Sequence, residues 1–295
     1  MVTPLRDRDA LDVSGLERLI EHMLAGGVAG LFILGTTGEG PLLSYRVRRE
    51  LVQRACAQVK RRVPVLVGVT DTAFVESLAM GEHASECGAD AIVAAPPYYL
   101  PLGQPELQVY YERLAAESPL PLFLYNFPAL TKTRIELDTL RRALDVERIV
   151  GIKDSSGDLN YFRSVRELTR ARSDWTLLCG PDESLAESIF IGGHGGVNGG
   201  ANVFPSLYVA CARAALAGET ERARELQTGV LRVTTGLYRV SKSAAAVTEG
   251  IKCALSLLGV CDDAMTEPFR RLTGAQREAI ERILPSLQSI MEELS

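Results

Sequence analysis

Short, continuous apolar runs alternate with longer amphipathic segments along the first 200 residues of the chain. Continuous apolar runs without polar alternation are typical of parallel strands covered on both faces. We expect helices where the amphipathic segments lie, with Asp12 or Ser14 capping the first and Ser44 the second. The expected strands are 30–34, 63–69, 89–94, 121–124, 149–152, 175–178 and the glycine-rich 195–200, and helices include 15–25, 45–60, 75–87 and 159–171.

Seven such strands, together with a stub at residues 1–4, predict a (β/α)₈ TIM barrel rather than an open doubly wound sheet. These four residues are too few for a full strand, so the first strand is expected to be truncated. The sequence has no GxGxxG after its first strand, which argues against a dinucleotide-binding fold. The glycine-rich segment 192–200 is either a phosphate cradle or, as we favour, a tight strand and turn.

The alternation of strands and helices stops near residue 219. Three helical segments follow, at 222–237, 244–258 and 274–294, with no strand between them. We therefore predict a catalytic barrel over residues 1–218 and a C-terminal three-helix domain over residues 219–295 that serves as an assembly surface.

Composition narrows the possible partners. The 295 residues are 46% hydrophobic and 23% charged, with a net charge of −5, so no basic footprint points to nucleic acid. No apolar stretch approaches the roughly 18 residues that span a bilayer. Six scattered cysteines without a CxxC pair, and no signal peptide, predict a cytoplasmic protein with free thiols. The histidines lack metal-ligand spacing, which argues against a zinc-dependent enzyme; they are His22, His83 and His194.

Candidate catalytic residues lie where two neighbouring strands are expected to end. One run ends in Tyr125-Asn-Phe-Pro128, and another ends in Lys153-Asp-Ser-Ser-Gly-Asp158. Barrel enzymes place their reactive groups at such carboxyl ends. Burial disfavours an ammonium ion, so a lysine at the edge of a dry interior is suited to attack a carbonyl, and a nearby tyrosine to move protons. The pair predicts Schiff-base chemistry, whereas each residue alone is more often structural.

A third strand end carries Gly35-Thr-Thr-Gly-Glu39. Two adjacent hydroxyls with nearby backbone N–H groups make a compact carboxylate receptor. Together with Lys153, Thr36 and Thr37 supply the two groups that a 2-oxo acid needs, an anion site and an amine.

The chain resembles the dihydrodipicolinate synthase/N-acetylneuraminate lyase family of pyruvate-dependent class I aldolases. The resemblance covers nearly the whole chain, and each motif is weak alone while the ordered set is specific. The motifs are Thr3-Pro4, Gly35–Glu39, Pro97-Tyr-Tyr99, Tyr125–Pro128, Gly151–Lys153 with Ser156–Asp158, and Gly180–Glu183.

This resemblance implies a barrel with three C-terminal helices, usually a homotetramer arranged as a dimer of dimers, and no cofactor. Lys153 would form the Schiff base with pyruvate and Tyr125 would act as general acid/base. Thr36 would relay protons and, with Thr37, bind the substrate carboxylate, while Tyr99 would reach into a neighbouring subunit. The other expected substrate-binding residues are Gly35, Ser155, Asp182, Glu183 and Val197.

Three sites separate branches of the family. Synthase members carry an arginine for the second carboxylate where this chain has Leu130, although Arg134 is close in sequence. Asp182 and Glu183 resemble the lyase branch, in which an acidic pair meets sugar hydroxyls; the alternative is that they only cap a helix. Gly199 stands where the sialic acid lyases tend to have serine.

The sequence therefore predicts a pyruvate-dependent lyase or aldolase for a 2-keto-3-deoxy sugar acid or a related 4-hydroxy-2-oxo acid. Alternatives are the synthase that condenses pyruvate with aspartate semialdehyde, and a sugar-acid dehydratase that uses the same imine. A non-catalytic oxo-acid-binding scaffold is the least favoured, because the Tyr, Lys and Thr set is intact.

Overall fold

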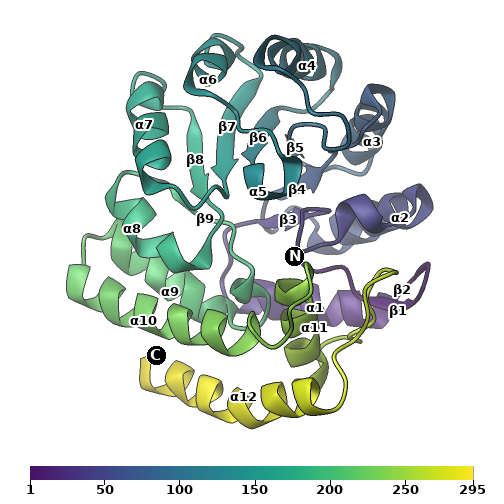
Figure 1. Ribbon diagram of the computed structural model, residues 1–295, viewed down its shortest axis with the longest axis vertical. Coiled ribbons are helices and arrows are strands. Elements are labelled where there is room, and N and C mark those ends of the chain that lie inside the picture. Colours follow the sequence, from purple (N-terminus) through teal and green to yellow (C-terminus); the bar gives the residue numbers. More distant parts are fainter. Residues whose placement is uncertain (295) are drawn as a thin grey trace.

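A curled parallel sheet surrounded by helices forms most of the molecule (Figure 1). The computed structural model describes residues 1–294. The strands are β1 (Leu5–Asp7), β2 (Ala10–Leu11), β3 (Leu31–Ile33), β4 (Val65–Gly68), β5 (Ala91–Ala94), β6 (Leu122–Asn126), β7 (Ile149–Asp154), β8 (Thr176–Cys179) and β9 (Gly195–Gly196). The helices are α1 (Val13–Ala25), α2 (Tyr45–Val59), α3 (Phe74–Glu86), α4 (Gln104–Glu117), α5 (Pro128–Thr131), α6 (Leu137–Ala143), α7 (Leu159–Thr169), α8 (Leu185–Phe190), α9 (Pro205–Leu216), α10 (Thr220–Leu237), α11 (Ala246–Leu257) and α12 (Ala275–Leu294).

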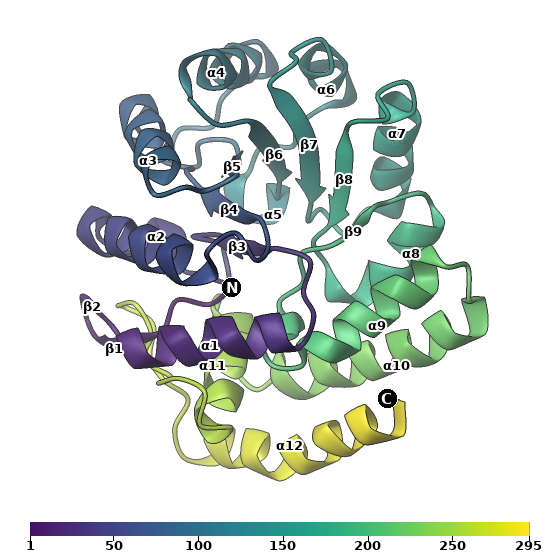
Figure 2. The same ribbon diagram turned by 180° about the vertical axis from the view of Figure 1, so that it is seen from behind.

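Strands β3 to β9 pair in the order in which they occur along the chain, each parallel to the next. The helices that connect them lie on the outer side of the sheet, as the opposite views in Figures 1 and 2 show. This arrangement confirms the predicted barrel-like α/β fold. It also brings the carboxyl ends of all the parallel strands to one edge of the sheet.

Local sequence signals account for the ends of several elements. The Asp12 side chain caps α1 by accepting a hydrogen bond from the Gly15 N–H, and the Ser44 side chain caps α2 through the Val47 N–H. Strands β6 and β7 extend two residues further than their apolar runs. This extension places Tyr125 and Lys153 within paired strands rather than in loops.

Residues 1–4 lie beside β3 and form no strand. The Met1 nitrogen donates to the Phe32 carbonyl, and on the other side the Val2 N–H donates to Asn202 Oδ1. The Thr3 hydroxyl donates to the Gly38 carbonyl at 2.6 Å. The segment thus lies between β3 and the chain that follows β9, where an eighth strand of a closed barrel belongs.

The apolar core has two parts. The large part lies between the sheet and its helices and includes Leu31 and Ile33. A small second cluster, made of Phe32, Val93, Ala95 and Tyr125, lies on the opposite face of the strands. The alternation of side chains along β3 therefore puts Phe32 inside the barrel, next to the strand ends that carry Tyr125 and Lys153.

Helices α10, α11 and α12 follow without an intervening strand, as predicted. α10 packs on α9, and α12 packs against both α10 and α11 (Figures 1 and 2). The division of the chain into domains at residue 218 stays a prediction. No helix among the described residues is long and apolar enough to cross a membrane.

Candidate active site

The ends of β6 and β7 bring the two candidate catalytic side chains together. In the parallel register of these strands, Tyr125 pairs with Lys153 and Asn126 pairs with Asp154. Directly paired residues of neighbouring strands project from the same face of a sheet. The two predicted catalytic residues therefore lie side by side.

A buried polar contact holds these strand ends in register. Asn126 Nδ2 donates to Asp154 Oδ1 at 2.7 Å, and the Ser156 hydroxyl donates to Asp154 Oδ2 at 2.9 Å. Asn126 Oδ1 in turn accepts the Ile135 N–H. Burial raises the pKa of the Asp154 carboxyl, against the lowering effect of the Asn126 and Ser156 hydrogen bonds. Asn126 and Asp154, which follow Tyr125 and Lys153, thus position these two residues.

Aromatic rings enclose the Lys153 amine. Lys153 is only 9% exposed, and its Nζ lies 4.5 Å from the centroid of the Tyr125 ring and 5.2 Å from that of Phe32. The two rings meet edge to face at a centroid distance of 6.1 Å. Ring faces stabilise a cation, so they suit both the ammonium and an iminium formed from it. Phe32 was not among the residues that the sequence pointed to.

The Thr36 hydroxyl lies 3.2 Å from the Tyr125 hydroxyl, within hydrogen-bonding distance. A tight loop after β3 places it there: Glu39 N–H donates to the Thr36 carbonyl, and Leu34 and Glu39 both have positive φ. A Cβ at Gly40 would collide with the Leu34 carbonyl, so this turn requires glycine. The loop and the β6 end together form a pair of hydroxyls next to the amine.

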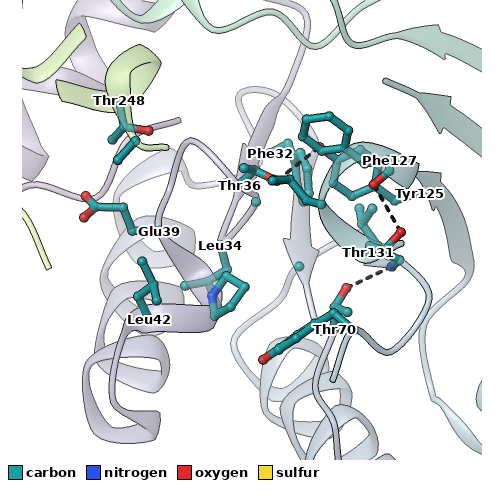
Figure 3. A pocket seen from close by; sticks show the side chains of 18 of the residues that line it. Phe32, Leu34, Thr36, Glu39, Leu42, Thr70, Tyr125, Phe127, Thr131 and Thr248 are labelled. Atoms are coloured by element: carbon teal, nitrogen blue, oxygen red, sulfur yellow. Dashed lines mark hydrogen bonds between the residues drawn. The ribbon is translucent and has the colours of Figure 1, made fainter. Parts of the chain in front are cut away.

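These hydroxyls face a cavity of about 330 Å³ (Figure 3). Gly35, Thr36 and Tyr125 line it at the strand ends, whereas Lys153 does not line it and lies against the Phe32 and Tyr125 rings, which do. The C-terminal region supplies the far wall, and Thr248 of α11 lies across the cavity from Phe127 (Figure 3). The residues that come from this region are Ala244, Ala245, Thr248 and Phe269.

A buried ion pair ties the loop after β3 to the C-terminal helices. Glu39 is 3% exposed and pairs with Lys252 of α11, whose side chain is fully buried. Glu39 Oε2 also accepts hydrogen bonds from the N–H and the hydroxyl of Thr266, at 2.8 and 2.7 Å. Burial lowers the pKa of Lys252, and the Glu39 carboxylate opposes this shift. The sequence analysis missed Lys252; the signal was a single lysine between apolar neighbours in α11.

Other predicted substrate-binding residues lie around the cavity without lining it. Thr37 is half-buried, and Val197 packs on the small aromatic cluster that contains Tyr125. The Ser155 N–H donates to the Asn126 carbonyl, and a Cβ at Gly180 would collide with the Ser155 hydroxyl. Tyr99 is 87% exposed and does not line the cavity of its own chain, while its neighbour Tyr98 does. The proposed contacts of these residues with substrate stay predictions.

Asp182 is 5% exposed, and its carboxylate is occupied by the protein itself. It accepts hydrogen bonds from the N–H groups of Gly199 and Gly200 at 3.1 and 2.9 Å, and from the Tyr238 hydroxyl at 3.0 Å. Burial, with the Asp182 charge as a second cause, raises the pKa of Tyr238 well above its usual value, which keeps that hydroxyl a donor. Glu183 is exposed, and neither acid lines the cavity. These contacts give Asp182 a structural role that differs from the predicted helix cap, because its carboxylate bonds to Gly199, Gly200 and Tyr238 and not to the start of α8. They also occupy N–H groups of the glycine-rich segment.

Arg134 does not replace the synthase arginine at Leu130. Its guanidinium donates to Asp158 at 3.2 Å and lies 5.0 Å from the centroid of the Tyr161 ring, and it does not line the cavity. Leu130 itself lines the cavity and is 49% exposed. The position that would hold a second carboxylate is therefore apolar.

Residues 1–287 match the model of the Dihydrodipicolinate synthetase family. The chain belongs to this family. A 4-hydroxy-tetrahydrodipicolinate synthase from Thiobacillus denitrificans is 34% identical over 95% of this chain and 92% of its own. A structure described as dihydrodipicolinate synthase from Bacteroides thetaiotaomicron superposes with a TM-score of 0.93 at 47% identity, covering 98% of this chain and 96% of that one.

A further structural neighbour is YagE, a prophage protein of the dihydrodipicolinic acid synthase family from E. coli K12, solved in complex with pyruvate. It superposes with a TM-score of 0.92 at 30% identity, covering 97% of this chain and 96% of that one. Membership confirms the predicted family and the enzyme class, a lyase. It leaves open the choice between synthase and other lyases, because both kinds of protein share the family.

Proposed function

We propose that this protein is a pyruvate-dependent Schiff-base aldolase that forms or cleaves a 4-hydroxy-2-oxo acid. The observation that carries this proposal is the pairing of Tyr125 with Lys153 in register, with the Thr36 hydroxyl 3.2 Å from the Tyr125 hydroxyl. The arrangement supplies an amine, a proton-transfer group and a hydroxyl relay at the edge of one cavity.

The Lys153 amine adds to the ketone carbon of pyruvate, and the carbinolamine loses water to give an iminium ion. Tyr125 protonates the departing hydroxyl, with Thr36 passing protons to and from it. The iminium withdraws electrons, so C3 releases a proton and an enamine forms. The enamine attacks the carbon of an aldehyde, whose oxygen takes up a proton to become the 4-hydroxyl. Water then hydrolyses the imine and restores the amine.

The same steps in reverse cleave a 4-hydroxy-2-oxo acid to pyruvate and an aldehyde. A 2-keto-3-deoxy sugar acid is one member of this class. Its selection from the sequence depended on Asp182 and Glu183, neither of which lines the cavity. We therefore propose the broader class.

Reductive trapping tests the proposal. Borohydride added to the protein with pyruvate is expected to leave a reduced pyruvyl adduct, which intact mass and peptide mapping locate. The chain has five lysines, and peptide mapping distinguishes an adduct on Lys153 from one on any of the other four. A folded protein that gives no adduct with pyruvate would rule out the imine mechanism.

Tyr125→Phe is expected to lower kcat by about 10²–10⁴-fold, the usual contribution of one positioned proton-transfer group. Trapping should still succeed but proceed more slowly, because Tyr125 serves the imine step without being the nucleophile. Steady-state kinetics and the time course of trapping measure the two effects. Tyr45→Phe, which removes a hydroxyl bonded to Asp71 rather than to Thr36, is the matched control and should leave kcat unchanged. Normal turnover in Tyr125→Phe would remove Tyr125 from the mechanism.

The alternative of condensation with aspartate semialdehyde is less well supported, because Leu130 stands at the arginine position and Arg134 is engaged by Asp158. A dehydratase would share the imine and would release water without carbon–carbon cleavage. We further propose a homo-oligomer, a dimer of dimers, as the working form, since Tyr99 is 87% exposed and available to a neighbouring subunit.

A further inference from the structure

Much of the wall of the active-site cavity is apolar. Leu42, Phe127, Leu130, Ala244, Ala245 and Phe269 line it, and they come from both the barrel and the C-terminal region. The cavity is continuous with the reacting end, since Thr36 and Tyr125 line the same space. Whatever carbon chain extends from the new carbon–carbon bond must therefore meet these side chains.

Most polar side chains that line the cavity already bond to the protein. The Thr70 hydroxyl accepts the Ala95 N–H at 2.8 Å, and the Thr131 hydroxyl donates to the carbonyls of Phe127 and Thr133. Beyond the hydroxyls of Thr36 and Tyr125, a ligand would find the hydroxyls of Thr248 and Tyr98 and the hydroxyl proton of Thr70. A polyol needs several donors and acceptors, and each buried hydroxyl without a partner weakens binding.

The only charged side chain on the cavity wall, among the described residues, is Glu39. Its carboxylate is paired with Lys252 and bonded to Thr266, so it offers no free charge to a ligand. A carboxylate on the second substrate would find no cation there, and an ammonium group would find no unpaired anion.

We propose that the second substrate of this enzyme is an uncharged aldehyde with an apolar substituent, so that the cleaved or formed acid is a 4-hydroxy-2-oxo acid with an aliphatic or aromatic group on C4. This inference rests on the proposed aldolase function and specifies its substrate class. Phe127 and Leu130 on one wall, and Ala244, Ala245 and Phe269 on the other, contact that group. In the condensation step, the enamine carbon bonds to the aldehyde carbon, and the aldehyde oxygen takes one proton.

The test compares aldehydes of matched size with pyruvate as co-substrate. Propanal and glyceraldehyde have the same number of carbons and differ in two hydroxyls. We expect kcat/KM to be at least about 10-fold higher for propanal, and to rise about 10-fold per added methylene from propanal to pentanal, as methylene groups in apolar pockets do. Succinic semialdehyde, which carries a carboxylate, is expected to be a poor substrate.

The variant Leu130→Arg tests directly whether the apolar cavity wall selects the aldehyde. Leu130 is 49% exposed, so arginine fits without unfolding the chain. The variant should lose at least about 10-fold in kcat/KM for pentanal and gain for succinic semialdehyde, because the new charge pairs with the carboxylate. Leu216→Arg, at a position 59% exposed on α9 and away from the cavity, is the matched control and should change neither value.

The outcomes separate this inference from the function on which it rests. A borohydride-trapped pyruvyl adduct on Lys153, together with a preference for glyceraldehyde or succinic semialdehyde, would overturn the inference and leave the aldolase function standing. An adduct without turnover of any apolar aldehyde would overturn it as well. Absence of the adduct would overturn both.

Discussion

Lys153→Ala is expected to lower kcat by on the order of 10⁶-fold, the size seen when a covalent nucleophile is removed from an enzyme. The loss is large because the amine carries every later step: without the iminium, C3 of pyruvate does not release its proton. The measurement is pyruvate release from a 4-hydroxy-2-oxo acid, with borohydride trapping on the same sample. We expect no pyruvyl adduct on the variant.

Two companion variants make the Lys153 test specific. Lys153→Arg keeps a cation over the Phe32 and Tyr125 rings but cannot form an imine, so it should be as inactive as the alanine variant. Lys242→Ala removes an exposed lysine and should turn over normally. Substantial turnover in Lys153→Arg would show that charge, not imine formation, is what the reaction needs.

The barrel could be predicted from the sequence because the signals for its strands and helices are local. Apolar runs mark the strands, and Asp12 and Ser44 mark the starts of two helices through their cap hydrogen bonds. Lys153 and Tyr125 could be predicted to meet because parallel strands end at one edge of a sheet. The observed register, in which they are directly paired, confirms that juxtaposition.

The rest of the site depends on contacts between distant parts of the chain, which no local pattern encodes. Asp182 is the type of residue that binds sugar hydroxyls, but its carboxylate accepts hydrogen bonds from Gly199, Gly200 and Tyr238, up to 56 residues away. The same holds for the far wall of the cavity, where Phe269 and Thr248 face residues of the barrel. Burial and partners decide what such side chains do.

The ion pair between Glu39 and Lys252 is another of these long-range contacts. Lys252 Nζ also donates to the Ala264 carbonyl at 2.7 Å, so one amine joins the loop after β3, helix α11 and the segment that follows it. The pair therefore holds the loop that carries Thr36 against the C-terminal helices. We expect its loss to affect both stability and catalysis.

Lys252→Met is expected to lower the free energy of unfolding by about 3–5 kcal/mol, because it leaves the Glu39 carboxylate buried without a counter-charge. Thermal and urea denaturation measure the effect, and kcat should also fall as the loop after β3 loosens. Arg224→Met, which breaks an exposed pair with Glu221 on α10, is the matched control and should leave stability nearly unchanged.

A second substitution distinguishes an unpaired charge from simple loss of packing. Adding Glu39→Gln to Lys252→Met removes the buried charge while keeping a side chain of similar size that still accepts from Thr266. We expect the double variant to be more stable than Lys252→Met alone, since replacing both members of a buried pair is far less damaging than removing one. If the two substitutions instead add their separate losses, the pair has no special energetic role, and Lys252 stabilises the fold through packing and its bond to Ala264.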